Sequence, residues 1–186
     1  RFRSVAEAMA TVPVATAALG PVAGLPAARL VAAHLSVMAR ENAQVLIAGP
    51  AVVERALGEQ KTKEELGGAN VHTKNGVIDN VADNEAHAFL QIRNFLSYLP
   101  ANVWELPPIT VSNDAPNRKE PALRDMIPRD RRKLYNMRTL ISHVVDTESF
   151  FEIGSEYGRG QITALARLSG QSVGIWANNC RYLAGA

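Results

Sequence analysis

The sequence predicts an α/β fold over residues 1–105 and a second, smaller unit near its end. Short apolar runs alternate with amphipathic segments from residue 12 to residue 99, a pattern typical of buried strands layered with helices. Sixteen of the first 56 residues are alanine, and such small side chains allow layers to pack closely. Six of the ten prolines lie between residues 100 and 128, so this stretch separates the two parts.

Composition limits the protein classes that fit. The chain has 186 residues, a net charge of +2 and 47% hydrophobic residues, which fits a globular protein and argues against a strongly basic nucleic-acid binder. Its single cysteine, Cys180, excludes an intramolecular disulfide framework and a cysteine-based zinc ribbon. No signal-peptide pattern is present. Residues 8–28 are uncharged, but Pro13, Pro21 and Pro26 interrupt them, which argues against a membrane-spanning helix.

The elements of the first part follow from apolar periodicity and from turn residues. Residues 20–24 are predicted to form a glycine-rich turn, and residues 71–81 a loop or short strand with a turn at Asn75–Gly76. Thr62 and Glu65 have the spacing of a capping box, and Gly67–Gly68 should end that short helix. The remaining predictions are strands over 12–17, 36–39 and 44–48, and helices over 26–34, 51–57 and 83–99.

Residues 106–130 are predicted to be a proline-rich basic linker or an extended covering arm. Residues 118–138 hold eight basic and three acidic residues. The run 129–133 is therefore either solvated or a site for phosphates or an acidic partner. Residues 131–186 should contain a helix over 135–145 and a hairpin around Ser169–Gly170. A hairpin and one helix cannot bury a core alone, so we expect them to be the start of a larger domain.

Most familiar catalytic motifs are missing from the sequence. The four histidines fit no metal-ligand spacing, and neither a GxSxG elbow nor a Walker A or GxGxxG motif is present. His87 is expected on a helix surface, and Cys180 is expected to be structural. The turn at residues 20–26 follows a strand and opens a helix, so its backbone N–H groups could form an oxyanion hole. A purely structural turn is the alternative.

A series of short motifs resembles one enzyme family along nearly the whole chain. The motifs occur in the same order as in that family: Gly20-Pro21-x-Ala23-Gly24, Gly49-Pro50-Ala51-Val52-Val53 with Gly58-Glu59, Glu65-Leu66-Gly67-Gly68-Ala69-x-Val71-His72-Thr73, Gly76-Val77-x-Asp79, Asp83-x-Glu85-x-x-Ala88, Tyr135-x-Met137-Arg138, Phe150-x-Glu152, Ala166-Arg167-Leu168-x-Gly170 and Val173-Gly174-x-x-Ala177-Asn178. Together they resemble the carboxyltransferase (β) subunit of biotin-dependent acyl-CoA carboxylases, the propionyl-CoA and methylcrotonyl-CoA carboxylase group.

The resemblance implies a crotonase-like ββα superhelix. Residues 1–105 would be the later part of an N-terminal domain, and residues 131–186 the opening of a C-terminal domain, with both ends of the protein missing. It also implies transfer of CO2 from carboxybiotin to the α-carbon of an acyl-CoA, without a side-chain base or a metal. The N-terminal oxyanion hole would consist of the N–H groups of Gly24 and Leu25, serving either the thioester or the biotin oxygen. Substrate would contact Ala23, Pro26, Gly67 and Gly68.

The implied partners are an acyl-CoA substrate, a biotin carboxylase/biotin carrier α subunit and further β subunits, with no nucleic acid or membrane. The implied location is the cytoplasm, or the mitochondrial matrix in a eukaryote, and the segment alone should be inactive. Two departures from the family pattern, Leu25-Pro26 in place of Gly-Ala and Asn136 in place of Asp, suggest a divergent subgroup. The alternatives are the carboxyltransferase of a biotin-dependent decarboxylase and a non-catalytic scaffold of the same fold.

Overall fold

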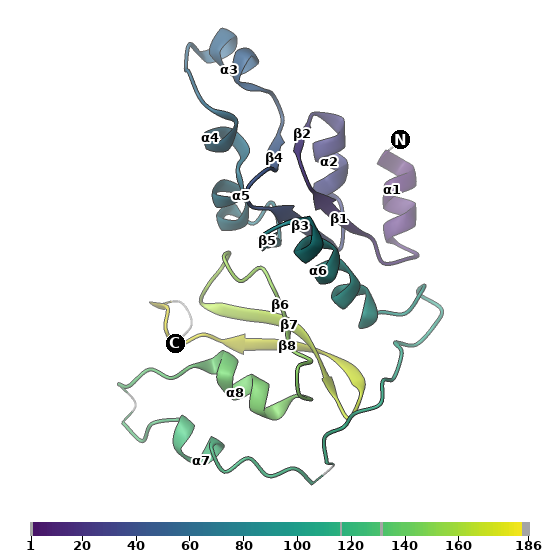
Figure 1. Ribbon diagram of the computed structural model, residues 1–186, viewed down its shortest axis with the longest axis vertical. Helices are drawn as coiled ribbons and strands as arrows, with labels where there is room; N and C mark the ends of the chain where they lie inside the picture. Colours follow the sequence, from purple (N-terminus) through teal and green to yellow (C-terminus); the bar gives the residue numbers. More distant parts are fainter. Residues whose placement is uncertain (1, 116, 131, 184–186) are drawn as a thin grey trace. The chain divides into compact units, whose positions relative to one another are not determined.

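The computed structural model describes residues 2–115, 117–130 and 132–183 (Figure 1). The chain divides into two compact units, residues 1–106 and 107–186. Helices and strands occur in both units, which confirms the predicted α/β class. The residues expected as a linker, 106–130, lie almost entirely within the second unit.

The first unit is built around two small parallel sheets. One has the strand order β1-β3-β5 and the other pairs β2 with β4. Helix α6 packs against the three-stranded sheet, and α2 packs against β1 and β2 (Figure 1). The elements are α1 (Phe2–Met9), β1 (Ala15–Ala18), β2 (Pro21–Ala23), α2 (Leu25–Val31), β3 (Leu35–Ala39), β4 (Gln44–Leu46), α3 (Pro50–Leu57), α4 (Lys63–Gly67), α5 (Ala69–Asn75), β5 (Asn80–Ala82) and α6 (Glu85–Ser97).

Small and medium apolar side chains form the core of this unit. Every residue of β3 and β4 is buried, as expected for parallel strands covered on both faces. The core includes Ala18, Ala27, Leu30, Met38 and Ile78. One buried polar group is satisfied by its neighbour, since the N–H and the hydroxyl of Ser36 each donate to Asp79 Oδ2 at 2.8 Å. Because several of the core side chains are alanine, the strands and helices of this unit can pack close together.

Several predicted elements of the first unit are confirmed. Strands cover most of 36–39 and 44–48, and helices cover 51–57 and most of 83–99. The capping box is present: the Glu65 N–H donates to the Thr62 hydroxyl at 3.2 Å, and the Thr62 N–H donates to Glu65 Oε2 at 2.8 Å. Bonds to Thr62, above all from its backbone N–H, lower the pKa of Glu65.

Two predictions in the first unit are wrong, and one helix was not predicted. Residues 21–23 form strand β2 within the expected turn, because they pair in parallel with β4. Helix α5 covers residues 71–75 of the stretch 71–81 that was expected to be a loop or short strand, and Gly76 ends it in the left-handed conformation with φ 78°. The rest of that stretch agrees with the prediction, since residues 76–79 form no helix or strand and strand β5 begins at Asn80. The Asn75–Gly76 signal therefore marks a helix end. Helix α1 also forms, over residues 2–9.

The second unit is a three-stranded antiparallel sheet with a helix on one face. Its elements are α7 (Leu123–Met126), α8 (Met137–Val144), β6 (Phe151–Ile153), β7 (Gln161–Leu168) and β8 (Gln171–Asn178), with the sheet order β6-β7-β8. Ile141 and Val145 pack against Ile162 and Ala166 in its core. The predicted hairpin is confirmed: Ser169 and Gly170 have φ values of 51° and 79°, as a two-residue type I′ turn requires.

Ion pairs fix the ends of this unit's elements. The Arg138 guanidinium at the start of α8 donates from Nε to Glu152 Oε2 at 2.6 Å and from a terminal nitrogen to Oε1 at 2.5 Å. This bidentate pair raises the pKa of Arg138 and joins α8 to β6. Arg138 and Glu152, which both belong to motifs quoted from the sequence, therefore hold helix α8 against strand β6.

The proline-rich segment is fastened to the second unit at several points. The Thr110 N–H donates to the Gly170 carbonyl at 3.0 Å. Asp114 accepts from the N–H of Thr147 at 2.8 Å and from its hydroxyl at 2.9 Å. Arg118 pairs with Asp114 at 2.6 Å and donates to the carbonyls of His143 and Val145. These contacts fit the covering-arm alternative.

The basic run at residues 129–133 is only partly described. Arg132 is exposed and pairs with Asp130 at 3.2 Å, and this pairing lowers the pKa of Asp130. Arg131 lies outside the described residues. Whether the run binds phosphates or an acidic partner stays a prediction.

We expect Gly170→Ala to destabilise the second unit. A Cβ at this position would lie 1.8 Å from the Thr110 carbonyl oxygen, and its φ of +79° disfavours any side chain. Left-handed strain and overpacking together should cost about 2–4 kcal/mol. The matched control is Gly174→Ala on β8, where a Cβ meets nothing within 4 Å. Hydrogen exchange of the hairpin amides measures the difference, and equal exchange in both variants would contradict the prediction.

We expect Asp114→Asn to weaken the arm in a pH-dependent way. The Thr147 N–H is the main group that lowers the pKa of Asp114. A lowered pKa contributes stability above the unfolded-state value of about 3.9, and this stability is lost as the pH falls through the folded-state value. The thermal midpoints of wild type and Asp114→Asn should therefore differ at pH 7 and converge toward acid pH. Asp125→Asn, at an exposed position in α7, is the control, and its thermal midpoint should equal that of wild type both at pH 7 and at acid pH.

Candidate functional site

Gly24 joins strand β2 to helix α2 in a conformation that only glycine adopts easily. Its φ is 66° and its ψ is −132°. Its N–H donates to the Leu46 carbonyl at 3.0 Å, and its own carbonyl accepts from Ala28 at 3.1 Å. Ala23 ends β2 in register with Leu46. The predicted turn residue is thus fixed between a strand pair and a helix.

Leu25 and Pro26 begin helix α2. Pro26 lies in the first turn, where the absence of an N–H costs little. Among residues 2–115, 117–130 and 132–183, the Leu25 N–H has no assigned acceptor. Of the two donors expected from the sequence, the Gly24 N–H is already bonded to Leu46, whereas the Leu25 N–H is available.

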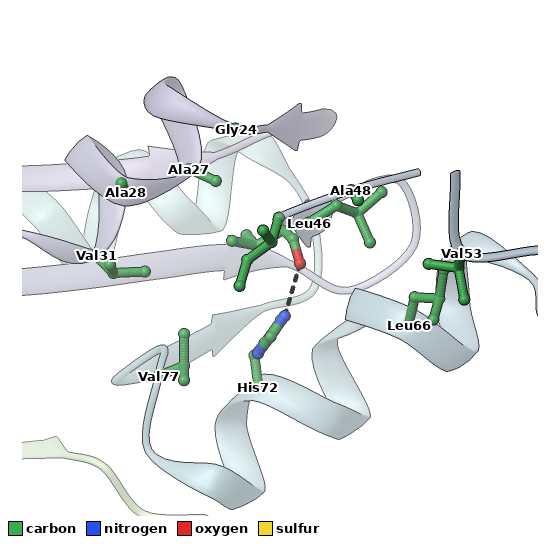
Figure 2. Close-up of a pocket in the computed structure, with 12 residues that line it drawn as sticks. Gly24, Ala27, Ala28, Val31, Leu46, Ala48, Val53, Leu66, His72 and Val77 are labelled. Atoms are coloured by element: carbon green, nitrogen blue, oxygen red, sulfur yellow. Dashed lines mark hydrogen bonds between the residues drawn. The ribbon is translucent and has the colours of Figure 1, made fainter. Parts of the chain in front are cut away.

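A cavity of about 570 Å³ adjoins this turn. In Figure 2 the α2 side chains lie on one side, Val53 and Leu66 on the other, and Leu46 and His72 between them. Nearly all of the lining is hydrocarbon or backbone. The lining residues are Gly24, Ala27, Ala28, Val31, Val45, Leu46, Ile47, Ala48, Val53, Leu66, His72 and Val77.

His72 is the titratable side chain of the cavity lining. Its Nε2 lies 2.7 Å from the Val45 carbonyl oxygen (Figure 2). A carbonyl only accepts, so Nε2 carries the proton, and Nδ1 faces the Asn75 side-chain amide at 3.5 Å. His72 therefore joins helix α5 to strand β4. Because its Nε2 donates to the Val45 carbonyl, this nitrogen does not act as a base toward a ligand.

Gly67 and Gly68, predicted to contact substrate, lie where helices α4 and α5 meet. A Cβ on Gly67 would lie 2.1 Å from the Val45 carbonyl oxygen, and one on Gly68 would lie 2.3 Å from a Glu64 carboxylate oxygen. The close approach of α4 to β4 therefore requires Gly67. Leu66 lines the cavity, whereas neither glycine is among its lining residues. Their contact with substrate stays a prediction.

Sequence reasoning did not identify the apolar wall of the cavity. Ala27, Ala28 and Val31 all line the cavity from α2, because Val31 lies four residues after Ala27 and three after Ala28. These residues could have been recognised from the sequence as a small-residue surface next to the turn. Val53 could not have been recognised as part of this wall from the sequence, because its position depends on the direction in which helix α3 leaves strand β4.

The described residues hold no group of three or more His, Cys, Asp or Glu side chains arranged to bind a metal ion. None of the helices that these residues form has both the length and the apolarity needed to cross a bilayer.

The carboxyl transferase domain model matches residues 1–186. The chain is 37% identical over 185 residues to a propionyl-CoA carboxylase carboxyltransferase subunit of Haloferax mediterranei, covering 99% of this chain and 36% of that protein. It is 35% identical over 180 residues to the methylmalonyl-CoA decarboxylase subunit alpha of Veillonella parvula, covering 96% of this chain and 35% of that protein. The chain therefore spans about a third of the length of these relatives.

Among solved structures, the transcarboxylase 12S hexamer with hydrolysed methylmalonyl-coenzyme A matches with a TM-score of 0.92 at 32% identity, covering 100% of this chain and 36% of that one. This match confirms the crotonase-like fold that the sequence resemblance implied. A family model that covers the full chain, relatives above 30% identity and a shared fold agree with one another. The chain belongs to the carboxyl transferase domain family.

Proposed function

We propose that this chain is part of the carboxyltransferase component of a biotin-dependent acyl-CoA carboxylase. Residues 1–106 would belong to its N-terminal domain and residues 107–186 to the start of its C-terminal domain. The reaction would transfer CO2 from carboxybiotin to the α-carbon of an acyl-CoA. The observation that carries the proposal is the available Leu25 N–H beside an apolar cavity.

The proposed role of Leu25 is to stabilise negative charge on the thioester oxygen. Removal of the α-proton turns the thioester into an enolate, and a fixed backbone donor stabilises the charge that develops. The surrounding hydrocarbon strengthens this interaction, because it lowers the local dielectric constant. Gly24 would hold the donor in place through its bond to Leu46, with Ala23 and Pro26 flanking the reacting group. Gly67 would act indirectly, by letting α4 approach β4 so that Leu66 lines the cavity, and contact of Gly67 or Gly68 with substrate stays a prediction.

The chain needs no side-chain base for this chemistry. When bound, carboxybiotin would supply both the CO2 and the group that accepts the α-proton. In the cavity, His72 is bonded through Nε2 to Val45, which fits a site that does not rely on histidine. The apolar wall suits an acyl chain better than a polar ureido ring, so we assign the Leu25 N–H to the thioester oxygen. The biotin-binding residues would then lie elsewhere in the protein.

The proposed partners follow from this assignment. They are an acyl-CoA substrate, a biotin-carrying α subunit and further copies of the β subunit, and the hexamer of the transcarboxylase 12S structure supports such an assembly. Cytoplasm, or the mitochondrial matrix in a eukaryote, is the proposed location.

A decarboxylase that runs the same half-reaction in reverse is the second candidate. Its support is the 35% identity to methylmalonyl-CoA decarboxylase, close to the 37% identity to propionyl-CoA carboxylase. The scaffold alternative loses its main support. Leu25-Pro26 leaves the helix start intact and keeps one N–H available.

The full protein with its biotin-carrying partner tests the proposal. With bicarbonate and ATP, we expect carboxylation of at least one of acetyl-, propionyl-, methylcrotonyl- or longer acyl-CoAs. If the partner forms carboxybiotin but no acyl-CoA is carboxylated, the carboxylase assignment is wrong. Biotin-dependent loss of CO2 from a carboxyacyl-CoA would then favour the decarboxylase.

We expect Leu25→Pro to lower kcat by about 10²–10³ in the full enzyme, because it removes the proposed donor. Proline is tolerated at the first helical position, so the fold should survive. Leu25→Ala is the control, since it shortens the side chain but keeps the N–H, and its kcat should stay within about tenfold of wild type. Equal kcat values for the two variants would show that the Leu25 N–H does not act on the oxyanion.

A further inference from the structure

Strand β4 is supported differently along its two edges. It pairs with β2 alone in a two-stranded sheet, and successive carbonyls of a strand point to opposite edges. Toward β2, the Leu46 carbonyl accepts from the Gly24 N–H at 3.0 Å. At the other edge, the structure places no strand among the residues that it describes, and the Val45 carbonyl meets helix α5 instead. This edge of β4 therefore depends on side-chain contacts.

The imidazole of His72 takes the place of a neighbouring strand at that edge. Its Nε2–H donates to the Val45 carbonyl at 2.7 Å (Figure 2), which is the kind of bond that a paired strand would supply. Val45 is 5% exposed, and the backbone of α4 at Gly67 crowds the same oxygen. Water therefore has little room to replace the imidazole, and a buried carbonyl without a donor is destabilised.

The position of β4 affects the proposed oxyanion donor in two steps. Val45 and Leu46 are adjacent in β4, so a shift of the strand away from α5 also moves the Leu46 carbonyl. That carbonyl anchors the Gly24 N–H, and Gly24, at φ 66°, sets the direction of the next N–H, at Leu25. A displacement of about 1 Å in a reacting group can cost about 100-fold in rate. His72 can therefore influence the reaction through the backbone, without transferring a proton.

We propose that His72 is a positioning residue, which holds β4 against β2 and so fixes the Leu25 N–H where the enolate oxygen develops its charge. The inference rests on the proposed function of Leu25. It assigns His72 to the transition state rather than to substrate binding, because an oriented donor matters most where charge develops. Loss of the His72 N–H should therefore lower kcat and leave the KM for acyl-CoA nearly unchanged.

His72→Leu in the full protein with its biotin-carrying partner tests the proposal. It removes the donor while keeping a side chain in the cavity wall, and we expect kcat to fall at least about tenfold with KM within about twofold of wild type. His72→Gln, whose amide N–H can reach the same carbonyl, should restore kcat to within about threefold of wild type. His72→Met also lacks a donor, and it serves if His72→Leu does not fold.

Thr73→Val is the matched control for a merely structural effect. Thr73 is the next residue of α5, and its hydroxyl donates to the Ala69 carbonyl at 2.7 Å within the same helix. The substitution removes a buried hydrogen bond within α5 and leaves the bond to β4 in place, so it should lower the thermal midpoint without lowering kcat. A fall in kcat equal to that of His72→Leu would overturn the proposal.

A double-mutant cycle shows whether His72 acts through Leu25. Leu25→Pro removes the N–H that His72 is proposed to position, so adding His72→Leu should lower kcat no further. Losses that multiply in the double variant would mean that the two residues act independently, which would contradict the proposal.

Hydrogen exchange of the Gly24 amide gives a readout that needs no turnover. We expect it to be at least about tenfold faster in His72→Leu than in wild type, and unchanged in Thr73→Val, because Gly24 donates to β4. Unchanged exchange in His72→Leu would refute the proposal even if kcat falls. Faster exchange together with equal kcat values for Leu25→Pro and Leu25→Ala would refute the proposed function of Leu25 and leave the coupling of His72 to Gly24 standing.

Discussion

The hydrogen bond from the Gly24 N–H to the Leu46 carbonyl fixes the geometry on which the candidate site depends. It extends the pairing of β2 with β4 by one residue beyond Ala23. In doing so it places Gly24 at φ 66°, a value that glycine alone adopts at low cost. The same bond uses one of the two N–H groups of the turn and leaves the next one, at Leu25, for a ligand. The hydrogen bond from Gly24 to Leu46 therefore both joins β2 to β4 and positions the Leu25 N–H of the candidate site.

Strand β4 organises the surrounding helices through its neighbouring carbonyl at Val45. Helix α5 reaches this oxygen with the His72 imidazole at 2.7 Å, and helix α4 approaches it so closely that only Gly67 fits. A strand of three residues thus sets the positions of α4 and α5, and Leu66 lines the cavity as a result.

The second unit is held together by polar side chains as well as by its apolar core. Its covering arm is held by the charged and hydroxyl groups of Asp114, Arg118 and Thr147.

Local signals in the sequence predicted local structure well. The Thr62–Glu65 box, the hairpin turn at Ser169–Gly170 and helix α6 each depend on residues within a few positions of one another. Strand β2 could not be predicted in this way, because its partner β4 lies more than twenty residues away. The Asn75–Gly76 pair is compatible with either a hairpin or a helix end, and tertiary packing selects the helix end here.

The candidate site shows the same division between local and non-local information. The sequence alone placed a glycine-rich turn and a helix start in this region, and the helix does begin at Leu25, directly after Gly24, but strand β2 inside the expected turn was not predicted. It could not show that the Gly24 N–H is bonded to Leu46, because that acceptor comes from a distant strand. The cavity depends on α2, β4, α3, α4 and α5 together, and no local pattern specifies their meeting.

A structure of the full protein with a non-hydrolysable acyl-CoA analogue would test the central claim most directly. The decisive measurement is the distance from the Leu25 nitrogen to the oxygen that replaces the thioester carbonyl. The account predicts about 2.7–3.1 Å, with the Gly24 N–H still bonded to Leu46 and the acyl chain lying between α2 and α3. An oxygen bound away from Leu25, with the Leu25 N–H bonded to another segment of the protein, would contradict it.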